Sequence, residues 1–206
     1  MTWLATLSAS TVLLAACATM DDPSEPSEGE ELQALSGPTV YKAGTSTAQA
    51  IQSSNPGAAL QINGGSELGS YLLARYSGNR ISGDVTADVT ITAAAGAAFS
   101  YVLVGSGTGY GGKQLRLERL PGSTTLRAGA AGGPVTCGSV PSGTPVQITL
   151  AVSPAAHQFD VLIDGAQTSC TNLATNLASP VIGFNLMDAS NQGYGGTVRY
   201  EGLSYR

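Results

Sequence analysis

The residues of this chain that could carry out hydrolysis are its carboxylates. Glycoside cleavage needs a protonated acid and a carboxylate about 5 to 9 Å apart, which acids two residues apart on one strand could provide. Asp84 and Asp88 stand four residues apart, as do Asp160 and Asp164, so each pair is separated by about 13 Å along a strand. The spacing therefore favours solvent-facing acids over a catalytic pair. Beyond residue 36 the acids are Glu67, Asp84, Asp88, Glu118, Asp160, Asp164, Asp188 and Glu201.

A nucleophilic triad would have to use His157, the only histidine of the chain. His157 follows Pro154-Ala155-Ala156, where we expect an exposed turn between two strands. The sequence also lacks the Gly-x-Ser-x-Gly turn that presents a nucleophilic serine after a strand. These features predict no catalytic residues.

A repeated Gly-Tyr-Gly-Gly motif occupies residues 109–112 and 193–196. Tyrosine on a glycine-rich loop suits a sugar ring, because its flat face is apolar and its hydroxyl forms hydrogen bonds. Tyr110 and Tyr194 are therefore the predicted ligand-binding residues. The other interpretation, in which each tyrosine covers a turn between strands, stays open.

The segment around the second tyrosine could also hold a hard cation. Asp188, Ser190 and Asn191 offer one carboxylate and several neutral oxygens, which are ligands that calcium accepts. A single carboxylate predicts weak binding, and an Asx turn explains the same residues. We therefore expect no resident cofactor, with a weak calcium site at Asp188 and Asn191 as the less favoured alternative.

The amino terminus has the pattern of an export signal. Residues 1–16 are apolar but too short to span a bilayer permanently, and they end at Leu14-Ala15-Ala16-Cys17. This tetrapeptide resembles the lipobox of bacterial lipoproteins, although no Lys or Arg precedes it. The resemblance implies cleavage before Cys17 and lipidation of its thiol, so that the membrane is a partner through the lipid anchor. Ala18 implies sorting to the outer membrane of the cell envelope, either periplasmic or surface-exposed.

Residues 17–36 predict a disordered tether between the lipidated cysteine and a folded domain. Their acids are Asp21, Asp22, Glu25, Glu28, Glu30 and Glu31. Acids, prolines and serines cannot bury enough apolar surface to offset the chain entropy. The same acids argue against the alternative, in which the first residues form a buried core helix.

Cys137 and Cys170 remain as a pair once Cys17 is assigned to lipid. In an oxidising compartment two thiols of one small domain usually form a disulfide. The closed loop of just over thirty residues would contribute about 3 to 4 kcal/mol in the chain-entropy model. A metal site or a catalytic thiol would need partners that the sequence does not offer.

Residues 37–206 predict a single all-β domain. Apolar and polar residues alternate in short runs between turn residues; the clearest run is Val146, Ile148, Leu150 and Val152, and the run after it ends at the hairpin signal Asp164-Gly165. No long stretch has helical periodicity. The expected strands are 39–43, 58–62, 71–76, 85–91, 99–104, 115–119, one near 126, 146–152, 159–163, 181–186 and 198–205, the last with a bulge at Gly202.

Three segments of the carboxyl half resemble concanavalin A-like jelly rolls, including laminin G-like domains. They are QFDVLIDGAQTSC at 158–170, VIGFNLMD at 181–188 and the closing VRYEGLSYR at 198–206. The resemblance implies an antiparallel β-sandwich of the jelly-roll type. A shared fold does not by itself establish function.

These observations predict a lipid-anchored binding or adhesion module of the cell envelope, without catalysis. The expected ligand is a glycan or an extracellular protein. The alternative is a structural or assembly-associated envelope lipoprotein, and a relative of the glycoside hydrolases is less favoured still. Nucleic acid is not an expected partner, because the sequence has no basic stripe with interleaved aromatic residues.

Overall fold

The structure of the protein, a computed structural model, describes residues 37–53, 56–67, 70–106, 114–188 and 196–206. Within these ranges every regular element is a β-strand. All of the strands belong to the unit Glu31–Arg206. The described ranges contain no helix that is long and apolar enough to cross a membrane.

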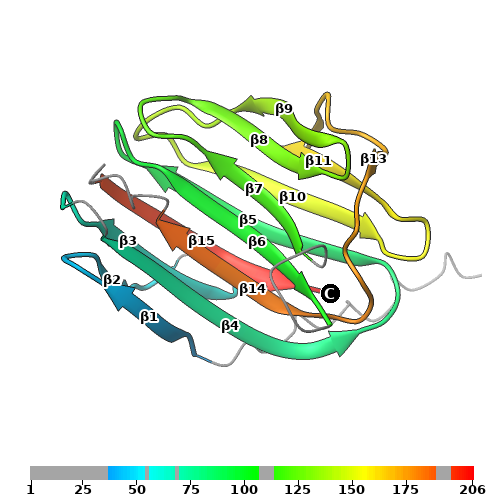
Figure 1. Cartoon of the computed structure of the whole chain (residues 1–206), viewed down its shortest axis with the longest axis horizontal. Coiled ribbons are helices and arrows are strands. Elements are labelled where there is room, and N and C mark those ends of the chain that lie inside the picture. The colour runs from blue at the N-terminus through cyan, green and yellow to red at the C-terminus, as the bar shows by residue number, and fades with distance from the viewer. Residues whose placement is uncertain (1–36, 54–55, 68–69, 107–113, 189–195) are drawn as a thin grey trace, which may run out of the picture. The chain divides into compact units, whose positions relative to one another are not determined.

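The strands form two antiparallel sheets that pack against each other as a β-sandwich (Figure 1). Sheet A has the order β1 (Thr39–Ala43), β4 (Tyr71–Ile81), β14 (Val181–Asp188), β6 (Phe99–Gly105), β7 (Gln114–Arg119), β8 (Thr125–Ala130) and β9 (Gly133–Ser139). Sheet B has the order β12 (Ala166–Gln167), β11 (Gln158–Ile163), β10 (Val146–Ser153), β5 (Val85–Ala93), β15 (Gly196–Tyr205), β3 (Ala58–Gly64) and β2 (Thr47–Ala50), and β13 (Leu173–Ala174) also pairs with β11. The predicted antiparallel β-sandwich is confirmed.

Alternation of apolar and polar residues sets which side of each strand faces the core. On β5, Val85, Ala87, Val89 and Ile91 are all buried, and the residues between them are half-buried on the outer side. Strand β10 has the same pattern. The predicted hairpin at Asp164-Gly165 joins β11 to β12, and both of its residues have the positive φ that such a turn requires.

Several elements differ from the expected ones. Strand β4 runs to Ile81 rather than ending near residue 76, because its far end pairs with Val181 of β14. Strands β2 and β9 were not predicted, since β2 has no large apolar residue and β9 begins with Gly-Pro. The bulge expected at Gly202 is present, because the register of β15 shifts between Glu201 and Ser204.

The space between the sheets is filled by aromatic side chains from both. The rings of Tyr101 and Phe184 lie 5.4 Å apart between centroids, and Phe184 meets Tyr205 edge to face at 5.2 Å. Phe99 meets Tyr200 edge to face at 6.3 Å. Such tilted and perpendicular contacts add to the stabilisation from burial alone.

The predicted disulfide between Cys137 and Cys170 is present, with a Cα–Cα distance of 5.0 Å. It joins β9, at the edge of sheet A, to the segment between β12 and β13 at the edge of sheet B. At the opposite edge the chain itself connects the sheets, because β1 lies in sheet A and β2 in sheet B. Both open sides of the sandwich are therefore covalently closed.

Arg119, the last residue of β7, points into the sandwich and is 1 % exposed. Its guanidinium donates hydrogen bonds to the carbonyls of Ser123 at 2.6 Å, Val140 at 3.0 Å and Ala94 at 2.9 Å, and to the hydroxyl of Ser142 at 3.2 Å. Burial lowers the pKa of Arg119 from its usual value. One side chain thus connects three turns from both sheets.

Candidate binding site

The outer side of sheet B is polar, because the residues between its apolar core positions carry hydroxyl and carboxylate groups. In the strand register Thr86 of β5 lies beside Ala151 of β10, which in turn lies beside Asp160 of β11. Thr149 and Asp88 form the next row. We call this surface the sheet B face; its side chains include Asp84, Thr86, Asp88, Thr149, Ala151, Ser153 and Asp160.

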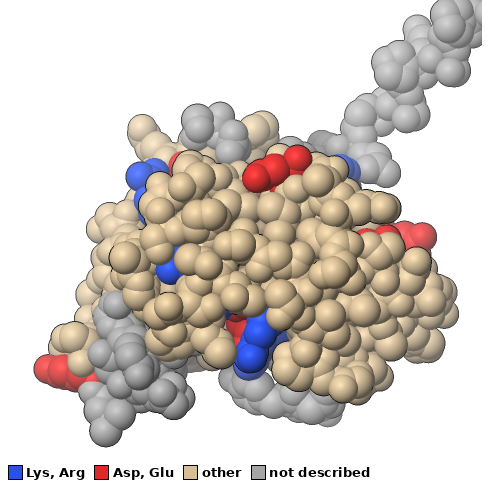
Figure 2. Space-filling view, turned by 90° about the horizontal axis from the view of Figure 1, so that it is seen from above, with Lys and Arg blue, Asp and Glu red and all other residues tan. Residues whose placement is uncertain are grey.

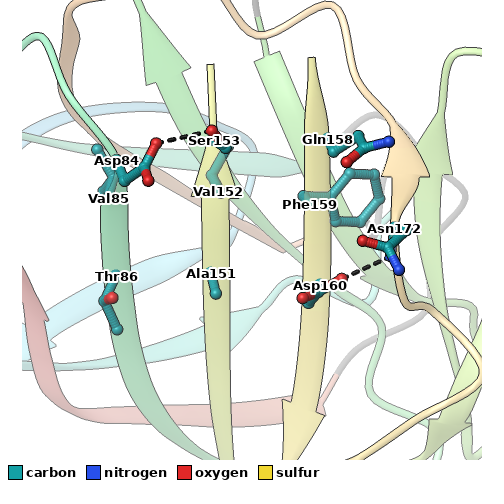
Figure 3. A pocket seen from close by; sticks show the side chains of 10 residues that line it. All are labelled: Asp84, Val85, Thr86, Ala151, Val152, Ser153, Gln158, Phe159, Asp160 and Asn172. Carbon is teal, nitrogen blue, oxygen red and sulfur yellow. Dashed lines mark hydrogen bonds between the residues drawn. The ribbon is translucent and has the colours of Figure 1, made fainter. Parts of the chain in front are cut away.

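A hollow of about 300 Å³ lies on the sheet B face. Asp84 and Asp160 stand on either side of β10, which carries Ala151 and Ser153 between them (Figure 3). The short side chain of Ala151 leaves space in the middle of the hollow. The hollow is lined by Asp84, Val85, Thr86, Ala151, Val152, Ser153, Gln158, Phe159, Asp160 and Asn172.

Both carboxylates of this hollow are held by hydrogen bonds. The hydroxyl of Ser153 donates to Asp84 at 2.7 Å, and the backbone N–H of Asn172 donates to Asp160 at 2.5 Å (Figure 3). Asn172 has a φ of 53°, a left-handed conformation that asparagine tolerates better than most residues. Each carboxylate is thereby oriented and keeps free lone pairs for a ligand.

A second hollow, of about 310 Å³, adjoins the first along β5. Asp88, one of its lining residues, accepts hydrogen bonds from the hydroxyl of Thr149 at 2.6 Å and from the guanidinium of Arg206 at 3.0 Å. Because Thr86 and Asp88 are two residues apart on one strand, both hollows open on the same face. This hollow is lined by Pro56, Asp88, Val89, Thr90, Gln147, Gly202, Ser204 and Arg206.

The register brings two acids around one hollow, which the spacing along a single strand did not predict. Asp84 and Asp160 are two strands and two register positions apart, which places their backbones about 12 Å from each other. The expectation that Asp88 and Asp160 stand on the solvent side of their strands is confirmed. The arrangement suits hydrogen bonding to a polar ligand.

The ligand-binding residues predicted from the sequence fall largely outside the described ranges. Tyr110, Asn191 and Tyr194 lie outside them, as does Cys17. Asp188 is described only as the last residue of β14, where its backbone pairs with Phe99. Within the described part of the chain no group of three His, Cys, Asp or Glu residues is arranged to hold a metal ion.

Strands β6 and β14, which precede the two tyrosine motifs, are antiparallel neighbours and end at opposite ends of sheet A. Val181, at the start of β14, pairs with Gly105 at the end of β6, and Asp188 at the end of β14 pairs with Phe99. The chain therefore leaves β6 and β14 at points about 20 Å apart.

Sequence reasoning missed Ser153, Asn172 and Arg206 as parts of a candidate site. The alternation in β5 and β10 could have indicated Thr86 and Ser153, because both occupy the solvent-facing positions of clearly predicted strands. Asn172 and Arg206 had no such signal. They reach the sheet B face only through a left-handed turn and through the bulge in β15.

No family model matches this chain, and no curated protein matches it. Several solved structures have a similar fold. A sialidase matches with a TM-score of 0.57 and 11 % identity over 73 % of this chain, which spans only 15 % of the sialidase chain. The cellulose-induced protein Cip1 matches with a TM-score of 0.55 and 14 % identity, over 84 % of this chain and 90 % of Cip1.

A third similar structure is the carbohydrate recognition domain of Emp46p in its potassium-bound form. It matches with a TM-score of 0.51 and 11 % identity, over 78 % of this chain and 87 % of that chain. At such low identities the likeness concerns the fold alone. Together with the strand order, these structures identify the domain as a jelly-roll β-sandwich.

Proposed function

We propose that this protein is a glycan-binding module without catalytic activity, and that its sheet B face holds the saccharide. The observation that carries the proposal is the pair of adjoining hollows lined by hydroxyls, carboxylates and amides. These are the groups that exchange hydrogen bonds with sugar hydroxyls. The fold supports the proposal, since one protein with a similar structure is the carbohydrate recognition domain of Emp46p.

The proposed binding mode follows from the oriented carboxylates. Asp84 and Asp160 accept hydrogen bonds from sugar hydroxyls, and the side chains of Thr86 and Gln158 add further polar contacts. A saccharide ring lies over Ala151, where no long side chain fills the hollow. Asp88 extends the site into the second hollow, which allows a ligand longer than one sugar.

Binding without hydrolysis is favoured by the way the two acids are held. Asp84 accepts a hydrogen bond from the hydroxyl of Ser153, and Asp160 accepts one from the backbone N–H of Asn172. Both carboxylates are thus oriented as acceptors for the hydroxyls of a sugar. We therefore infer that these acids recognise a saccharide and do not cleave it.

The proposed setting is the cell envelope, with the domain tethered by lipid on Cys17. The disulfide between Cys137 and Cys170 supports a location outside the reducing cytosol, because such bonds persist mainly in oxidising compartments. Sorting to the outer membrane rests on the resemblance to a lipobox and on Ala18. Mass spectrometry of protein from native membranes would detect the acyl groups.

Saccharide titrations of three variants test the proposed site. We expect Asp84→Asn and Asp160→Asn each to weaken binding of a glycan-array hit about fivefold to tenfold, because each loses a charged acceptor. Glu201→Gln is the matched control, since Glu201 stands on sheet B beside Arg199 but lines neither hollow. Binding that survives both substitutions but disappears in Tyr110→Ala or Tyr194→Ala would move the site to the loops. Co-purification with a fixed protein partner, without saccharide affinity, would favour the assembly alternative.

A further inference from the structure

The outer side of sheet A carries three arginines and one acid among the few charges of this protein. Only 11 % of the residues are charged, and in Figure 2 acids and bases occur as small separate groups on a mainly uncharged surface. On sheet A the register places Arg75, Asn185, Val102 and Arg116 in one row across four strands. Glu118 and Arg127 pair in the next row. We call the set Arg75, Asn185, Arg116, Glu118 and Arg127 the arginine face.

Arg75 is held at one end of this row by two neighbours. Its guanidinium carbon lies 5.7 Å from the centre of the Tyr41 ring, within cation–π range. Its Nε donates to the side-chain oxygen of Asn185 at 3.4 Å. The two terminal nitrogens have no partner in the described part of the chain, so Arg75 presents free, oriented donors.

Asn185 is 5 % exposed although its side chain belongs to the outer side of sheet A. Its amide oxygen accepts the bond from Arg75, and its amide nitrogen has no partner among the described residues. The amide nitrogen is therefore a donor that a ligand with an acceptor oxygen can bind.

At the other end of the row two arginines share one acid. Arg127 lies 2.5 Å from Glu118, and Arg116 lies 3.8 Å from the other oxygen of the same carboxylate. The Nε of Arg127 is buried and has no hydrogen-bond partner in the part of the chain that the structure describes. The arginine face thus has three guanidinium groups and one carboxylate, and it carries donors without acceptors.

We infer that the arginine face binds the oxyanion groups, carboxylate or sulfate, of an acidic polysaccharide. Guanidinium groups match the planar pairs of oxygens in such anions and bind them with two parallel hydrogen bonds. Arg75 and Arg116 are three strands apart, about 14 Å at the backbone, a span wider than one oxyanion. The row therefore fits a polymer with repeated acidic groups rather than an isolated ion. This site does not depend on the sheet B face.

Binding of three polymers to the full chain tests the inference. Polygalacturonate supplies carboxylates, dextran sulfate supplies sulfates, and dextran is the neutral reference. We expect retention by at least one of the anionic polymers and none by dextran, although the chain has a net charge of -5 and should repel polyanions. Which anionic polymer binds more tightly identifies the oxyanion.

Arg116→Ala and Arg199→Ala form a matched pair for this experiment. Both arginines are 44 % exposed and each lies near a glutamate two residues further along the chain, but only Arg116 belongs to the arginine face. We expect Arg116→Ala to weaken polyanion binding about threefold to fivefold, Arg75→Ala/Arg116→Ala to weaken it more than tenfold, and Arg199→Ala to leave it unchanged.

Three results would overturn the inference. They are equal retention by dextran, an equal loss in Arg199→Ala, and no retention by either anionic polymer. Circular dichroism of each variant separates a lost site from a lost fold. Arg116→Lys keeps the charge without the planar fork, and we expect it to restore only part of the affinity.

Discussion

The outer faces of the two sheets are built by the same alternation of side chains but carry opposite charge. On sheet B the described acids Asp84, Asp88, Asp160 and Glu201 outnumber Arg199 and Arg206. On sheet A the arginine face has three bases and one acid. The acids and bases of the folded part nearly cancel in number, so net charge conceals this division. We therefore expect the two faces to differ in the ligands that they take, the first through acceptors and the second through donors.

The largest expected effect concerns Arg119, the arginine of sheet A that points inward rather than outward. Arg119→Met leaves the carbonyls of Ser123 and Val140 without their donor, whereas the carbonyl of Ala94 keeps the backbone N–H of Ala97. Each unsatisfied group costs about 1 to 3 kcal/mol, so we expect the free energy of unfolding, measured by urea denaturation, to fall by at least about 2 kcal/mol. Arg116→Met, at an exposed position on the same strand, should change it by less than about 0.5 kcal/mol.

A similar loss in both variants would contradict the distinction between inward and outward arginines. If Arg119→Met does not fold, Arg119→Lys provides the measurement. Lysine keeps the charge but carries a compact ammonium group in place of the planar guanidinium fork, so it cannot reach carbonyls that lie in three different turns. We expect it to be intermediate in stability between Arg119→Met and the unmodified chain.

The sequence predicted the strands that form the two faces better than it predicted which side chains meet on them. Alternation identified β5, β10 and β11 and the solvent position of Asp88, because each of these strands buries one side. The meeting of Asp84 with Asp160 depends on the register between strands, which no local pattern encodes. Arg119 followed the inward parity of Leu115 and Leu117, but its partners lie in three turns that only the fold brings together.

A smaller effect is expected from Glu118, the one described acid of the arginine face. Glu118→Gln frees Arg127 and Arg116 from their shared carboxylate and removes a charge that repels anions. We expect the affinity for an anionic polysaccharide to rise about threefold. Affinity electrophoresis of this variant beside Asp88→Asn, which removes an acid from the sheet B face, would measure the difference.

Asp88→Asn should leave polyanion binding unchanged, because Asp88 stands on the opposite sheet and is paired with Arg206. Equal gains in both variants would mean that polyanions respond only to net charge. The proposed separation of the two faces would then be wrong.

The last comparison concerns the interior between the faces, where two buried tyrosines differ in whether their hydroxyls have a hydrogen-bond partner. Burial, with a smaller contribution from the charge of Asp88, raises the pKa of Tyr101 well above its usual value, and its hydroxyl has no partner in the described part of the chain. The hydroxyl of Tyr205 instead donates to the carbonyl of Asn79 at 2.5 Å. Tyr101→Phe therefore removes an unsatisfied group, whereas Tyr205→Phe removes a bond.

We expect Tyr101→Phe to raise the free energy of unfolding by up to about 1 kcal/mol and Tyr205→Phe to lower it by about 1 kcal/mol. Denaturant titrations of both variants measure this difference. Each variant loses one tyrosine hydroxyl, so the two are directly comparable. A loss of stability in Tyr101→Phe would mean that its hydroxyl is satisfied, for example by an internal water. The sign of the change at Tyr101 therefore decides whether the layer between the two faces is dry.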